Sequence, residues 1–167
     1  ANDSPFSPSA TSSAGLPIIY EVNAGPAKIV NNQVQLTGYN GTVYLQAKQN
    51  GGDGFCAAIP QLQSFNVTGG HNTQMYVGGT YNNWNMKSMI IENNIWKLKN
   101  QVFLAGNYEL KFANTNNFTG QDWGNSNGLS STAQQTTGGG ANIVFTITNP
   151  GTYTIDFNDI TLQYNIS

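Results

Sequence analysis

Residues 141–166 read ANIVFTITNPGTYTIDFNDITLQYNI, and the spacing of apolar side chains in this stretch decides the fold class. Apolar residues recur at every second position in three short runs, and the turn signals NPG and FND separate these runs. The apolar members are Ile143, Phe145 and Ile147, then Tyr153, Ile155 and Phe157, then Ile160, Leu162, Tyr164 and Ile166. A period of two with one apolar side is typical of antiparallel strands that bury one face and expose the other.

The same alternation is found upstream. In GTVYLQAKQ (41–49), one apolar side alternates with a polar side, and in GNYELKFANT (106–115) Tyr108, Leu110 and Phe112 are expected to face the core. Lys111 then stands on the opposite, solvated face of its strand. No stretch has the period of an amphipathic helix. The sequence therefore predicts an all-β chain built from antiparallel β-sandwiches.

A short polar joint divides the chain. The strand-like stretch LQSFNVTG ends at Gly69, and Gly70, His71 and Asn72 follow before the next strand. A chain of 167 residues has room for two small domains. We predict two sandwiches in tandem, with a first domain over 1–68, a linker over 69–73 and a second domain over 74–167. His71, the only histidine, is expected to be a solvated linker residue.

Composition excludes several function classes. Charged residues make up 8% of the chain, the net charge is -2 and there is no Arg. Nucleic-acid binding needs a dense basic surface, so no nucleic-acid partner is expected. No apolar run approaches the roughly 20 residues of a membrane helix, so membrane insertion is not expected either. Cys56 is alone and cannot form an intrachain disulfide; a small buried side chain is expected there.

Catalytic motifs are missing from the sequence. A glycosidase needs two carboxylates across a cleft, and the chain has only eight acidic residues. Asp156 and Asp159 are close in sequence, but IDFND is typical of a strand that runs into a turn. We expect Asp159 to cap this turn and Asp156 to point outward beside it. The sequence predicts no enzyme, no cofactor and no assigned metal site. The Asp and Asn oxygens of DFND could hold a structural Ca²⁺, although their spacing matches no established loop.

Two tryptophans lie in polar loops. MYVGGTYNNWN (75–85) contains Trp84, and GQDWGNSNG (120–128) contains Trp123. An indole can cover the flat C–H face of a sugar, while Lys111 and nearby Asn side chains can hydrogen-bond its hydroxyl groups. The alternative is that each indole folds back to cap one end of the sandwich.

Residues 74–166 resemble a known family. The features that carry the resemblance are VGG…NNW, NNIWKLKNQVFLAGNYELKF, the DWG loop and the closing GTYTIDFN hairpin. They are similar to the C-terminal modules of the outer-membrane starch-binding lipoproteins of Bacteroidetes, and in their order to the starch-binding modules attached to amylases. This resemblance implies one glucan site at Trp84, Lys111 and Trp123. It places Trp96 in a second site, although alternation with Leu98 favours a core position.

Residues 5–68 resemble the small immunoglobulin-like repeats of long secreted bacterial proteins. The pieces that carry this resemblance are ATSSAGLPIIYEV, GPAKIVNNQVQLTG, GTVYLQAKQNG and QSFNV. It implies a spacer or an adhesin stalk, and no ligand site is assigned to this segment.

The sequence thus predicts a spacer followed by a non-catalytic module that binds an α-glucan. Trp84 and Trp123 would stack on sugar units, and Lys111, Asn125 and Asn127 would bind hydroxyl groups. The implied partner is a polysaccharide, with a glycan-active enzyme fused or associated, in a bacterial protein that is secreted or held on the outer surface. Two alternatives stay open, namely a stalk without a glycan site and a module for another glycan such as a β-glucan.

Overall fold

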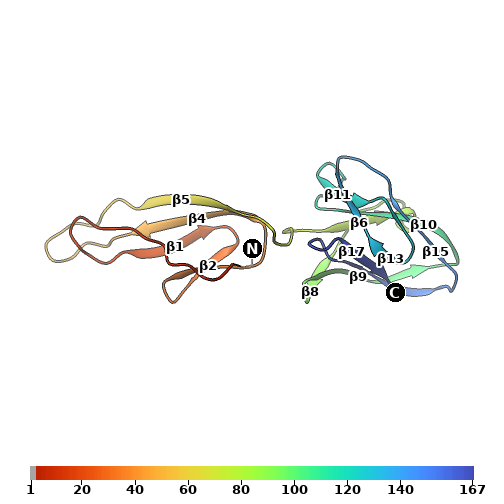
Figure 1. The fold of residues 1–167 in the computed structure, drawn as a ribbon, viewed down its shortest axis with the longest axis horizontal. Helices are drawn as coiled ribbons and strands as arrows, with labels where there is room; N and C mark the ends of the chain where they lie inside the picture. The colour runs from red at the N-terminus through yellow and green to blue at the C-terminus, as the bar shows by residue number, and fades with distance from the viewer. Residues whose placement is uncertain (1–2) are drawn as a thin grey trace. The chain divides into compact units, whose positions relative to one another are not determined.

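The computed structural model describes residues 3–167, and the chain divides into two compact units at His71/Asn72 (Figure 1). Both units are built from strands, and the one helical element in the described residues is a 3-10 turn, η1 (Thr80–Asn82). The all-β prediction is confirmed. Within residues 3–167 no helix is long and apolar enough to cross a membrane.

The first unit contains two small antiparallel sheets. Its strands are β1 (Ile19–Ala24), β2 (Ala27–Val30), β3 (Gln33–Leu36), β4 (Gly41–Lys48) and β5 (Gln61–Val67). β4 lies between β1 and β5, and β2 pairs with β3. Val34, Val43 and Val67 are buried, and Phe6 packs edge-on against Phe65 with ring centroids 5.8 Å apart.

Two expectations for the first unit are wrong. Cys56 is exposed rather than buried, because it lies in the turn between β4 and β5 and not on a strand. His71 is buried rather than solvated. Its backbone N–H donates to Gly38 and its carbonyl accepts from Asn40, so the polar joint is tied to the 38–40 turn.

The second unit is larger. Its strands are β6 (Tyr76–Gly79), β7 (Lys87–Ser88), β8 (Ile90–Glu92), β9 (Ile95–Phe103), β10 (Gly106–Ala113), β11 (Gln121–Gly124), β12 (Ser126–Asn127), β13 (Ser130–Thr132), β14 (Gln134–Thr137), β15 (Ile143–Ile147), β16 (Gly151–Phe157) and β17 (Gln163–Ile166).

These strands form two sheets. The β10 sheet has the order β12-β15-β10-β11-β14, and β6 pairs with β10 and β7. The β16 sheet has the order β13-β17-β16-β9-β8. All pairings are antiparallel apart from the short parallel contact between β12 and β15.

The inner faces of the two sheets make one core. Phe112 of β10 stacks on Phe157 of β16, with ring centroids 4.2 Å apart and ring planes 7° apart. The alternation predicted for β15 is confirmed, since Ile143, Phe145 and Ile147 are all buried. Burial of such apolar side chains is the main stabilising term of a sandwich, at about 25 cal/mol per Å².

The last predicted strand begins later than expected. Ile160 is 46% exposed and Leu162 has a φ of 62°, so both lie in the turn before β17. Asn158, not Asp159, caps this turn, because its Oδ1 accepts from the N–H groups of Ile160 and Thr161 at 3.0 Å. Asp159 accepts instead from Asn72, at 2.7 Å from the backbone N–H and 2.8 Å from the side chain.

Candidate functional site

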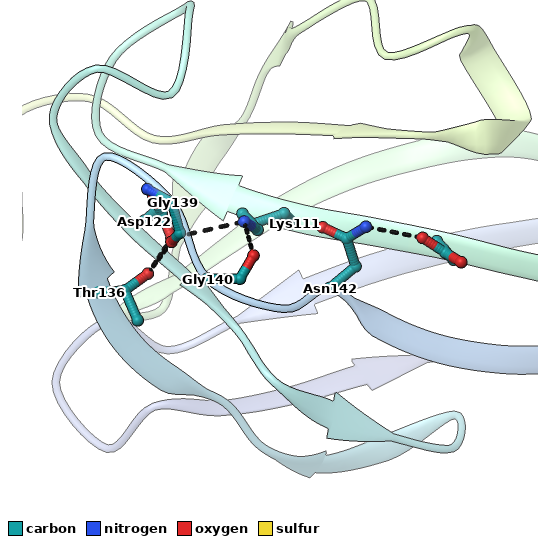
Figure 2. Close-up of polar contacts among 7 residues, drawn as sticks. Lys111, Asp122, Thr136, Gly139, Gly140 and Asn142 are labelled. Atoms are coloured by element: carbon teal, nitrogen blue, oxygen red, sulfur yellow. Dashed lines mark hydrogen bonds and ion pairs between the residues drawn. The ribbon is translucent and has the colours of Figure 1, made fainter.

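Lys111 is the centre of a buried polar network on the outer side of β10. Its ammonium group donates to the carbonyl of Gly140 at 2.5 Å and lies 3.8 Å from Oδ1 of Asp122 (Figure 2). It also lies 5.9 Å from the ring centroid of Phe118, within the range of a cation–π contact. Only 7% of Lys111 is exposed, so its charge is held mainly by these protein groups.

Asp122 of β11 completes the network. Its side chain is fully buried, and it accepts from the backbone N–H of Gly139 at 3.0 Å and from the hydroxyl of Thr136 on β14. A buried carboxylate is tolerated when it has a cation and hydrogen-bond donors around it. The Lys111–Asp122 pair therefore ties β10, β11 and the 138–141 segment together.

The prediction that Lys111 stands on a solvated face is wrong. The alternation in β10 does turn its side chain away from Leu110 and Phe112, but the segment that joins β14 to β15 folds over it. Gly140 has a φ of 104°, and a Cβ there would lie 2.7 Å from Oγ1 of Thr136. The glycines of TTGGGA thus allow the close approach that covers Lys111.

The network extends along β10. Nδ2 of Asn142 donates to the carboxylate of Glu109 at 2.6 Å, two residues before Lys111 (Figure 2). Thr80 adds a further contact, since its hydroxyl accepts from the backbone N–H of Glu109 at 3.0 Å. The outer side of β10 is therefore lined with satisfied polar groups rather than with free ligand-binding groups.

Trp84 is paired with a second aromatic ring. It is half-buried and packs edge-on against Phe118, with ring centroids 6.0 Å apart and ring planes 72° apart. Its φ of 60° is held by a hydrogen bond of 2.8 Å from its N–H to the carbonyl of Gly79. The side-chain amide of Asn82 donates to the backbone carbonyl of Asn85, and that of Asn85 donates to the backbone carbonyl of Asn82, which fixes this turn.

Phe118 was not singled out by the sequence analysis. It lies in the loop between β10 and β11, is half-buried and has a φ of 54°. A Cβ on Gly78 would lie 2.7 Å from Sδ of Met86, 3.3 Å from the backbone oxygen of Trp84 and 3.4 Å from the Phe118 ring, so the ring of Phe118 packs over β6. The signal in the sequence is an apolar ring within the polar stretch NTNNFTG.

The expectation that Trp123 faces the ligand is not met. Trp123 is 1% exposed and its ring packs 5.6 Å from that of Phe157. The physical reason is register, since Trp123 pairs with the inward-facing Phe112 and shares its side of the sheet. Trp96 is 4% exposed, in agreement with its alternation and not with a second surface site.

Asn125 and Asn127 are both exposed. Nδ2 of Asn125 donates to Oε1 of Gln134 at 2.5 Å, and its backbone N–H donates to Ala141, next to the carbonyl that binds Lys111. The side chain of Asn127, in β12, forms no hydrogen bond with the part of the chain that the structure describes. The structure therefore brings Asn125 to the edge of the Lys111 network.

Asp156 and Asp159 have separate protein partners. Oδ2 of Asp156 lies 2.9 Å from Nζ of Lys97, while Asp159 binds Asn72. Within residues 3–167 no three His, Cys, Asp or Glu side chains come together as a metal-binding group.

Comparison with known proteins gives one structural match. The chain is similar to SusF from Bacteroides thetaiotaomicron, with a TM-score of 0.42 and 12% sequence identity. The match covers 94% of this chain and 44% of SusF, so the chain spans less than half the length of that protein. Neither a protein-family model nor a curated protein sequence matches the chain.

Proposed function

We propose that the second unit is a non-catalytic carbohydrate-binding module for an α-glucan, with Trp84 and Phe118 as its apolar surface. The observation that carries this proposal is the half-buried Trp84–Phe118 pair. The pair lies between loops rich in Asn and Thr, which can bind sugar hydroxyl groups. In this proposal Phe118 takes the stacking role that the sequence resemblance implies for Trp123.

The inclination of the two rings favours a curved ligand. Rings set 72° apart cannot both lie against a flat, β-linked chain, whereas successive units of an α-linked chain present inclined C–H faces. Burial of the sugar faces against these rings supplies the apolar part of the affinity. Asn125 and Asn127 are proposed as hydroxyl partners at the exposed rim.

Lys111 has a positioning role in this proposal. Its ammonium group is engaged by Gly140 and Asp122 and lies beneath Phe118. It therefore holds the loops that carry the aromatic surface, and the sugar contacts fall to the neighbouring side chains.

The remaining parts of the proposal rest on the sequence resemblances. The first unit is proposed as an immunoglobulin-like spacer, and the whole as part of a secreted or surface protein that holds a glycan-active enzyme against polysaccharide. A single small site should bind with a Kd on the order of micromolar to millimolar. Repeated modules would raise the apparent affinity through avidity.

One observation favours the stalk alternative. Trp96 and Trp123 are both in the core, so only one of the three tryptophans has an indole at the surface. A stalk domain would need no exposed aromatic pair, so the behaviour of Trp84 separates the two proposals.

Affinity gel electrophoresis tests the proposal directly. Wild-type protein is run in gels with starch, pullulan, laminarin, xyloglucan or hydroxyethyl cellulose, beside Trp84→Ala and Phe118→Ala. Tyr44→Ala, at an exposed tyrosine of the first unit, is the matched control. We expect starch and pullulan to retard the wild type and the control, and both site variants to lose this retardation.

Other outcomes decide against parts of the proposal. Retardation by laminarin or hydroxyethyl cellulose alone would favour a β-glucan. If both site variants keep the retardation, Trp84 and Phe118 do not form the glucan site. If no gel retards the wild type, the stalk alternative is favoured.

A further inference from the structure

A polar groove crosses the β16 sheet, the sheet that does not carry Trp84 and Phe118. It is open to solvent and has a volume of ≈ 440 Å³, within the usual range of small-ligand pockets. Its polar lining includes Ser130, Thr132, Asp156, Gln163 and Asn165. No residue of the proposed α-glucan site lines this cavity.

The strand register builds one wall of this groove. Ser130 pairs with Asn165, Asn165 pairs with Asp156, and Asp156 pairs with Lys97. Paired residues in neighbouring antiparallel strands point to the same face, so these four side chains form one polar row. Four strands about 4.8 Å apart give this row a span of roughly 14 Å.

A second polar row lies two residues along the same strands. Thr132 pairs with Gln163, and the backbone carbonyl of Gln163 accepts from the backbone N–H of Asn158 at 2.8 Å. Because side chains alternate along a strand, this row faces the same side as the first one. The groove lies between two rows of hydroxyl, amide and carboxylate groups.

Asp156 has an oxygen without a donor. Lys97 donates to its Oδ2 at 2.9 Å, while its Oδ1 is buried and has no hydrogen-bond partner within residues 3–167. Because Oδ1 is covered by protein atoms and 21% of the side chain is exposed, a ligand hydroxyl group would donate to Oδ2, which can accept more than the one bond from Lys97. Lys97 already balances the carboxylate charge, so a cationic ligand is not needed.

Four other polar side chains of the groove are free to bind. Those of Ser130, Thr132, Gln163 and Asn165 form no hydrogen bond with any other described residue. Hydroxyl and amide groups both donate and accept, which matches the hydroxyl groups of a sugar. The nearby rings of Phe157 and Tyr164 are buried, so recognition here would use hydrogen bonds to ligand edges and not stacking.

We propose that this groove is a binding site for a neutral, hydroxyl-rich sugar, with Asp156 as the acceptor and Ser130 and Asn165 as its flanking partners. The site is separate from the Trp84–Phe118 surface and does not rest on the function proposed for that surface. It would allow the module to contact a glycan on both sheets.

The test is a site-resolved ¹H–¹⁵N NMR titration of the full chain. The neutral probes are maltotriose, cellotriose, laminaritriose and xylotriose, and the charged probes are trigalacturonate and a glucosamine trimer. At least one neutral probe should give saturable shifts at the amides of 130–132 and 163–165. Ser130→Ala and Asn165→Ala should each weaken this binding about fivefold or more. Ser88→Ala and Asn149→Ala, both at exposed positions outside the groove, should leave it unchanged.

Each further outcome has a distinct meaning. Shifts at the Trp84 indole without shifts in the groove overturn this inference and leave the proposed function standing. Shifts in the groove without shifts at Trp84 support it and count against the proposed function. The inference is also overturned if only a charged probe shifts the groove amides, or if no probe shifts them. It is equally overturned if both groove variants retain these shifts in full.

Discussion

The ammonium group of Lys111 lies 3.8 Å from the carboxylate of Asp122, and the two side chains are 9% and 0% exposed. Two charges at that depth are stable only together, because each one alone would lack its counter-charge. This pair joins β10 to β11 beneath the loops that carry Phe118 and Gly140.

Replacing one member of this pair should lower the free energy of unfolding more than replacing both. Asp122→Asn leaves the Lys111 charge buried, and we expect the free energy of unfolding to fall by about 3–5 kcal/mol. Adding Lys111→Met to that variant should recover part of the loss. Urea denaturation of both single variants and the double variant measures the coupling. Lys99→Met breaks the exposed pair with Glu92 and should cost no more than about 1 kcal/mol. Additive losses at Lys111 and Asp122 would show that the pair is not coupled.

Trp123 of β11 and Trp84 of the turn after η1 should have different roles, the first in stability and the second in binding. Trp123→Ala empties a core position and should lower the free energy of unfolding by about 3–5 kcal/mol. Trp84→Ala, at the half-buried surface pair, should cost much less stability and remove glucan binding. Thermal denaturation beside the affinity gels separates the effects. A Trp123→Ala variant as stable as the wild type would contradict its place in the core.

Removal of the hydroxyl group from two tyrosines should change the free energy of unfolding in opposite directions. The hydroxyl of Tyr81 is buried and has no hydrogen-bond partner among the described residues, so Tyr81→Phe should raise the free energy of unfolding by about 1 kcal/mol. The hydroxyl of Tyr164 lies 3.1 Å from the carbonyls of Asn127 and Gly128, so Tyr164→Phe should lower it by a similar amount. Chemical denaturation at neutral pH compares them. A loss of stability in Tyr81→Phe would point to a partner for its hydroxyl.

Burial of Tyr81 also predicts a pH dependence. Burial raises the pKa of its phenol above the ordinary value of 10.0. The unfolded chain therefore loses this proton first, and stability falls as pH rises above about 10. Tyr81→Phe should flatten this fall, which denaturation between pH 9 and about pH 11 measures. An equal fall in both proteins would assign it to other groups.

Gly124 marks a close approach of two backbone segments. A Cβ at Gly124 would lie 2.2 Å from the carbonyl oxygen of Ala141, so Gly124→Ala should destabilise the unit by about 1–3 kcal/mol. At Gly151 the same change meets only Tyr153, at 3.7 Å, and should be neutral or slightly stabilising. Melting temperatures of both variants check this. Equal effects would mean that the 138–141 segment moves freely.

Alternation in the sequence determined the sandwich and much of its core. Ile143, Phe145 and Ile147 are buried as expected, because a strand with one apolar side has only one stable orientation. Alternation with Leu98 also favours the buried position that Trp96 has, whereas the family resemblance assigned Trp96 to a second ligand site. These are local properties of each strand, so they can be read without the partner strands.

Only the tertiary structure decided which polar and aromatic groups reach the surface. Trp123 follows the inward register of Phe112, and Lys111 is covered by a loop that begins more than 20 residues later in the chain. Phe118, a residue with no periodic signal, packs against Trp84 in place of Trp123. Strand pairing and loop folding depend on contacts between distant segments, and alternation within one strand contains no information about them.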